Sequence, residues 1–307
     1  MDLLTAIALT VITAATPLLL AALGELVVER AGVLNLGVEG MMLAGAVTGF
    51  AVTHLAGSHT LGILAAALAG AALALIFGVL TLSLLANQVA TGLALTIFGI
   101  GLSALIGAPF VGTPSPRLPE LNIPGLTDLP VVGPILFGQD VLVYLSILLT
   151  AGIAWFLFRT RAGMILRACG ENAEAAHALG YPVRKVRYLA VLFGGAMAGL
   201  GGAYLSLAYT PMWAEAMTAG RGWIALALVV FAAWRPGRLL LGAYLFGAVT
   251  ILQLNAQGWG LFAVPSQILA MLPYLATVLV LVAISAGPWK GRLNAPANLG
   301  QPFRPVG

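Results

Sequence analysis

Charged residues are scarce in this sequence, and that scarcity sets the class of the protein. Only 8% of the 307 residues are Asp, Glu, Lys or Arg, against roughly 25% in a soluble domain, while 61% are hydrophobic. Uncharged runs cover 3–24, 40–116, 141–158, 188–214 and 239–289. A helix needs about 20 apolar residues to cross a bilayer. The sequence therefore predicts an all-α polytopic membrane protein rather than a soluble domain with a very apolar core.

Cysteine, histidine and lysine are also rare, and their scarcity removes several kinds of site. The lone Cys169 excludes an internal disulfide framework. The three histidines are too scattered for a metal or catalytic cluster, so no catalytic residue and no metal ligand is assigned. Neither lysine is followed by Ser or Thr, so the Gly-Lys-Ser/Thr of a phosphate-binding loop is missing. We therefore expect no ATP chemistry, no enzyme activity and no cofactor on this chain.

The apolar runs predict about nine membrane segments, within a range of eight to ten. They are expected at 4–27, 33–53, 61–84, 89–110, 140–158, 188–209, 220–234, 239–256 and 266–286. The segment 220–234 is short for a full crossing, so we expect it to be tilted or re-entrant and buried in protein. The whole chain, 1–307, is expected to form one transmembrane domain.

Basic residues indicate which side of the membrane each loop occupies. They cluster at 159–187, at 235–238 and at 290–304, and the positive-inside rule places all three clusters in the cytoplasm. The stretch 113–139 is rich in Pro and Gly with balanced charges, so it is expected to be an external loop. With nine segments, the N-terminus is external and the C-terminus cytoplasmic. No basic residue precedes the first apolar run, which argues against a cleaved signal peptide.

The cytoplasmic loop 159–187 is too polar to lie in lipid, and residues 171–179 within it predict a short helix. Asn172 is a suitable cap, and Glu174 falls in the first turn, where the helix dipole favours an acid. Gly180 can end the helix in a left-handed conformation. An ordinary amphipathic connector is the alternative interpretation.

The letters EAAHALG, residues 174–180, resemble the coupling-helix motif of bacterial ABC importer permeases. In that family this helix docks into a groove of the ATP-binding subunit. The resemblance implies that the coupling contacts come from Glu171, Glu174, Ala175, Ala176 and Gly180.

Three further blocks extend the resemblance over most of the chain. They are ERAGVLNLGVEGMMLAGA at 29–46, ANQVATGLALTIFGIGLSALIG at 86–107, and GRGWIALALVVFAAWRPGRLLLGAYLFG at 220–247. All three resemble the permease family that imports branched-chain amino acids, simple sugars and nucleosides. The form NLGVEG and the chain length are most similar to the shorter permease of nucleoside and simple-sugar importers.

This resemblance implies a type II-like ABC permease that forms a translocation path in a bacterial plasma membrane. The expected partners are a second permease in a heterodimer or homodimer, an ATP-binding subunit that holds ATP and Mg, and an external substrate-binding lipoprotein; no nucleic acid is expected. Nucleosides are the expected solutes, with simple sugars or branched-chain amino acids as alternatives. An autonomous secondary carrier or channel is the rival of a different class, and it would need an ion relay within the membrane.

Glu39 is the acid that this map places deep in a segment. If the helix begins near Gly32, Glu39 lies about 10 Å along it at 1.5 Å per residue. Ionisable groups at such depth face the protein interior or a water-filled cavity. Asn35 is four residues earlier and would share a helix face with Glu39. Either the pair lines the translocation path or Glu39 fixes helix packing, and the packing role is favoured.

Other polar groups at membrane depth are the remaining candidates for the path. They are Gln88, Thr91 and Asn255, and the alternative role, which is favoured, is to join helices through hydrogen bonds. Glu29 and Arg30 are expected at a solvated or paired position on the membrane boundary. Five tryptophans are expected near the membrane interfaces, in the tryptophan belts: Trp213, Trp223, Trp234, Trp259 and Trp289.

Overall fold

A computed structural model describes residues 3–259, 271, 275, 278, 282 and 295–304. Within these residues the chain is helical, and its β-structure is limited to three isolated bridges. The long helices are α1 (Leu3–Arg30), α2 (Val38–Ala56), α3 (His59–Gly78), α4 (Gln88–Gly107), α6 (Val141–Arg159), α9 (Val183–Tyr204) and α11 (Pro236–Trp259). The short helices are α5 (Val132–Phe137), α7 (Arg161–Glu171), α8 (Ala173–Ala178) and α10 (Arg221–Phe231).

Single turns of other helix types extend three of the long helices. The π-turns Val79–Ser83 and Leu205–Tyr209 follow α3 and α9, and a 3-10 turn, Ala108–Phe110, follows α4. With these extensions, seven helices in the described part of the chain are long and apolar enough to cross a membrane. The all-helical polytopic architecture is therefore confirmed at this level.

The expected count of nine segments is not reached in the described residues. Seven of the nine expected segments correspond to the seven long helices. The segment expected at 220–234 is the 11-residue helix α10, which is too short for a helical crossing, as its expected length had indicated. The segment expected at 266–286 lies outside the described residues, except for four helical positions, Met271, Leu275, Val278 and Val282.

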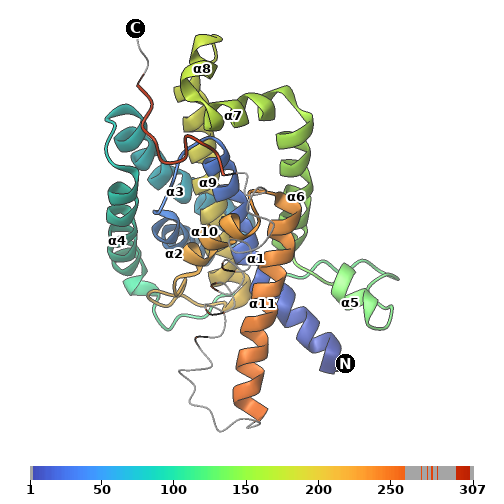
Figure 1. The fold of residues 1–307 in the computed structure, drawn as a ribbon. Coiled ribbons are helices and arrows are strands. Elements are labelled where there is room, and N and C mark those ends of the chain that lie inside the picture. Colours follow the sequence, from blue (N-terminus) through green and yellow to red (C-terminus); the bar gives the residue numbers. More distant parts are fainter. Residues whose placement is uncertain are drawn as a thin grey trace.

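The centre of the molecule is formed by α1, α2 and α9. The buried share of each span is 61% for α1, 78% for α2 and 72% for α9, against 33% for each of the other four. Glycines let these helices approach closely, as small residues do in membrane bundles. A side chain added at Gly45 would clash with the backbone of Gly199, and one added at Gly24 would lie 2.6 Å from Met197 Cβ. The peripheral helices α3, α4, α6 and α11 surround this centre (Figure 1).

The two ends of the molecule carry different loops (Figure 1). Helices α7 and α8 project from one end, which also carries the described C-terminal residues. The N-terminus and α5 lie at the opposite end. Helix α5 belongs to the stretch expected as an external loop, 113–139, so the two polar loops are on opposite ends as the predicted topology requires. Which end faces the cytoplasm stays a prediction.

Candidate functional site

An irregular seven-residue segment, 31–37, separates α1 from α2, and we call it the break. The expectation of a helix from residue 33 is therefore wrong, because α2 begins at Val38. Asn35 is responsible in part: its Oδ1 accepts a hydrogen bond from Gly37 N at 2.9 Å, while its own N–H donates to Glu25 Oε1 at 3.1 Å. Such side-chain bonds offer the backbone an alternative to helix.

The break changes the expected relation between Asn35 and Glu39. The two residues do not share a helix face, since Asn35 lies in the break and Glu39 in the first turn of α2. Both side chains are nevertheless buried, and that of Glu39 is only 6% exposed. The prediction that both side chains point inward is therefore correct, although it assumed that the two residues lie on one helix.

The Glu39 carboxylate holds the N-terminus of α10. Its Oε1 accepts from the Thr218 hydroxyl and from Gly220 N at 2.8 Å, and its Oε2 accepts from Gly222 N at 2.6 Å. The first N–H groups of a helix lack partners within the helix, and the positive end of the helix dipole favours an anion. Glu39 therefore caps α10 from another helix, which is the packing arrangement favoured above. A role in lining the path stays a prediction.

The chain before α10 is shaped to make this contact possible. Ala216, Ala219 and Gly220 have φ angles of 53°, 47° and 81°. Left-handed conformations are costly for alanine, so surrounding structure must hold this turn. A Cβ at Gly222 would lie 2.6 Å from the Glu39 Cα, so only glycine permits the approach. Helix α10 contacts α1, α2 and α11, and thus begins inside the helix bundle.

A second buried polar cluster joins the end of α1 to the end of α10. Trp234 donates its indole N–H to Glu29 Oε2 at 2.6 Å, and its carbonyl accepts from Arg30 Nε and Nη2 at 3.2 and 3.0 Å. Glu29, Arg30 and Trp234 are all buried. Glu29 and Arg30 are therefore paired rather than solvated, whereas Trp234 does not face outward as a belt residue would. Trp213 is buried too and is likewise no belt residue.

Glu39 is consequently not the only acid within a span. Glu25 and Glu29 both belong to α1 and are both buried. The segment expected at 4–27 placed Glu25 near its end and left Glu29 outside it, so neither acid was counted as deep in a span; α1 in fact continues to Arg30. The spacing of four residues, which places both acids on one helix face, was the available signal.

The other residues predicted as candidates for the translocation path are Gln88, Thr91 and Asn255, and only some of them lie near the break. Gln88 is buried at the start of α4, and its Oε1 accepts from Leu34 N at 2.8 Å, so it joins Asn35 at the break. Thr91 is half-buried one turn further along α4. Asn255 donates from Nδ2 to Ile251 O of its own helix, α11, at 3.0 Å. The structure therefore places Gln88, but not Asn255, in contact with the break.

The predicted short cytoplasmic helix is α8, but it begins two residues later than expected. Asn172 adopts an extended conformation and accepts from Ala175 N at 2.9 Å, so it caps α8 as predicted. Glu171 instead ends the preceding helix α7, which was not expected. Gly180 follows α8 with φ 85°, the left-handed conformation predicted for it.

Only part of the coupling motif faces outward. Glu174 and Ala175 are exposed, whereas Ala176 is buried against Cys169 and Val183. Ala176 therefore packs α8 onto its own chain, which corrects its expected contact with a partner. Leu179 was missed: its side chain is 77% exposed at the end of α8. Together with Glu174 and Ala175, Leu179 gives α8 an exposed surface.

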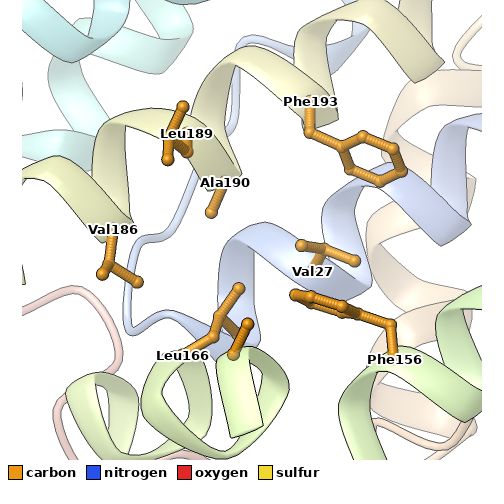
Figure 2. Close-up of a pocket in the computed structure, with 8 residues that line it drawn as sticks. Val27, Phe156, Leu166, Val186, Leu189, Ala190 and Phe193 are labelled. Atoms are coloured by element: carbon orange, nitrogen blue, oxygen red, sulfur yellow. The ribbon is translucent and has the colours of Figure 1, made fainter. Parts of the chain in front are cut away.

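A cavity of about 350 Å³ lies where α1, α6, α7 and α9 meet. Its lining side chains are all hydrophobic, including Val27, Phe156, Leu166 and Phe193, and Figure 2 shows them converging from the four helices. A polar solute needs hydrogen-bonding partners when it leaves water. This cavity offers none from its side chains, so it does not suit a polar solute.

Comparisons with known proteins agree on one family. A family described as branched-chain amino acid transport system / permease component matches residues 7–284. The putative glucose ABC transporter permease protein TsgC13 of Haloferax volcanii is 43% identical over 95% of both chains. The guanosine ABC transporter permease protein NupQ of Bacillus subtilis is 33% identical over 94% of this chain and 93% of its own. The nucleoside ABC transporter permease protein NupC of Lactococcus lactis is 34% identical over 87% and 88%. No solved structure matches the chain.

Proposed function

The chain belongs to the branched-chain amino acid transport system permease family, and we propose that it forms the translocation path for nucleosides in an ATP-driven importer. Its relatives are permease components of ABC transporters, and the seven long apolar helices among the described residues agree with a multi-pass membrane subunit. In this proposal ATP and Mg are bound by a separate subunit. The C-terminus lies in the cytoplasm, the N-terminus outside, and the membrane is the plasma membrane.

The observation that carries the mechanism is the projecting helix α8. It stands beyond the long helices at one end of the molecule, with Glu174, Ala175 and Leu179 exposed on it (Figure 1). A short capped helix of this kind transmits force well, because its ends are fixed by Asn172 and Gly180. In our proposal α8 docks on the ATP-binding subunit, and a second permease presents an equivalent helix to a second ATP-binding subunit.

The solute class rests on the relatives. Two of them are named for guanosine or nucleosides, and one for glucose, so simple sugars are the second candidate. Branched-chain amino acids are the third, from the family description. The solute is selected by an external binding lipoprotein, and the permease holds it only loosely.

Uptake by the reconstituted importer tests the solute class. Proteoliposomes that contain this chain, its ATP-binding subunit, its second permease and its binding protein receive labelled guanosine, glucose or leucine. We expect ATP-dependent accumulation of guanosine. Accumulation of glucose alone would replace the nucleoside proposal by the sugar proposal, and accumulation of leucine alone would contradict both.

Co-purification tests the docking helix. Ala175→Trp places a large side chain on the exposed face of α8 and should reduce recovery of the ATP-binding subunit with the tagged permease. Leu179→Asp should do the same by removing the apolar contact, at about 1.5–3 kcal/mol for one buried leucine. Val131→Asp, an exposed apolar position at the opposite end, is the matched control. Unchanged recovery with both α8 variants would contradict the proposed docking surface.

A further inference from the structure

The segment 295–304, which we call the strap, lies at the same end of the molecule as α7 and α8 (Figure 1). It overlaps the basic cluster 290–304, which the positive-inside rule places in the cytoplasm. In the structure it forms hydrogen bonds with the junction of α7 and α8, with the break 31–37, and with the start of α9. Three elements far apart in the sequence are thus joined by one short segment.

Asn298 joins the strap to the junction between α7 and α8. Its N–H donates to Gly170 O at 2.9 Å, and its Oδ1 accepts from Ala173 N at 3.2 Å. Ala297 N also donates to Glu171 Oε2 at 3.3 Å. Ala173 is the first residue of α8, so its N–H has no acceptor within the helix. The Asn298 side chain supplies that acceptor, in addition to the Asn172 cap on Ala175 N.

The other end of the strap is bonded to the break. Gly300 N donates to Gly32 O at 3.2 Å. Arg187, at the start of α9, donates from Nη1 to Gln301 O at 3.0 Å and from Nε to Ala31 O at 3.1 Å. Its side chain is only 1% exposed. One buried guanidinium therefore connects the strap, the break and α9, and Arg suits this role because its donors lie in a rigid fork.

The junction of α7 and α8 also rests directly on the end of α1. A side chain at Gly170 would clash with the carbonyl of Arg30, and one at Gly32, whose φ is 86°, would lie 3.1 Å from the Gly170 Cα. These backbone contacts leave little room for α7 to move independently of the break. A close-packed junction of this kind transmits displacement rather than absorbing it.

We propose that the strap is part of the coupling element, with Asn298 and Arg187 as positioning residues that make the break follow the motion of α8. This inference rests on the proposed docking of α8 to an ATP-binding subunit. The break leads directly into α2, whose second residue, Glu39, caps α10. A displacement of α8 would thus reach the N-terminus of α10 inside the bundle through bonded contacts.

Hydrogen exchange on the assembled importer separates this inference from the proposed docking. Binding of the ATP-binding subunit should slow exchange in residues 173–178, which reports docking. ATP should change exchange in residues 31–37, which reports transmission. We expect Asn298→Ala, and more strongly a chain that stops after Pro296, to keep the first effect and to weaken the second.

Transport stoichiometry supplies a second readout that a loss of folded protein does not alter. Solute accumulated per ATP hydrolysed should fall about fivefold or more in the shortened chain, which is the lower range of ordinary allosteric coupling. The same ratio should fall less with Asn298→Ala. It should not change with Asn122→Ala, a control at an exposed asparagine in the stretch 113–139. The side chain of Asn298 is small and only half-buried. Asn298→Ala should therefore fold even if the shortened chain does not.

The outcomes are distinct. In one outcome, residues 173–178 are protected, and the ATP response of residues 31–37 is the same in the wild type and in both variants. That result would overturn the role of the strap and leave the docking intact. An unchanged ratio of transport to hydrolysis in both variants would do the same. Absence of protection at 173–178 in the wild-type importer would overturn the docking itself, and the strap inference with it.

Discussion

At the scale of residues, Glu39 is the clearest case of an acid whose role follows from its partners. Oε1 has two donors and Oε2 has one. Glu39→Gln keeps the oxygen for Thr218 and Gly220 but turns an amide NH₂ toward the Gly222 N–H, at a cost of about 1–2 kcal/mol. Glu39→Leu leaves all three donors without an acceptor and should cost about 3 kcal/mol or more.

Thermal unfolding in detergent, together with uptake per folded molecule, checks this order. The melting temperature should fall slightly for the glutamine variant and strongly for the leucine variant, with most uptake retained by glutamine. If both variants melt like wild type but no longer transport, Glu39 acts on the solute instead and lines the path.

At the scale of elements, glycines decide how closely α3 and α9 pack. A side chain at Gly70 would clash with Gly195 O, a backbone atom that cannot rotate away. Gly70→Ala should therefore destabilise the fold by about 1–3 kcal/mol, as overpacking does. Gly101 on α4 has open space around its Cβ direction, so Gly101→Ala should leave the melting temperature unchanged or slightly higher. Equal melting temperatures for the two variants would show that α3 and α9 are not packed in this way.

At the scale of the whole molecule, the proposed importer takes its energy from a separate ATP-binding subunit. The sequence has no phosphate-binding loop, and its relatives are permease components of ABC transporters. Proteoliposomes that contain this chain alone should show no concentrative uptake of labelled guanosine, with or without ATP. Saturable accumulation against a gradient under these conditions would support the autonomous carrier, for which the buried acids Glu25, Glu29 and Glu39 would be the first candidates.

The sequence by itself determined the class, seven of the long helices, the N-cap of α8 and the left-handed glycine that follows it. These depend on properties that are local along the chain: long apolar runs, the preference of Asn172 for a cap, and the freedom of Gly180 to adopt a positive φ. The missing phosphate-binding loop is likewise a matter of a few adjacent residues.

Only the tertiary structure decided what the buried polar groups contact. Glu39 and Gly222 are 183 positions apart, and Glu29 and Trp234 are 205 apart, so no periodicity relates them. The break after α1 depends on Glu25, Asn35 and Gln88 meeting from three elements, and the strap depends on Asn298 meeting the start of α8. Apolar patterning is set by contact with lipid and is visible residue by residue. A buried polar group must find a partner wherever the fold brings one, and that partner is chosen by packing.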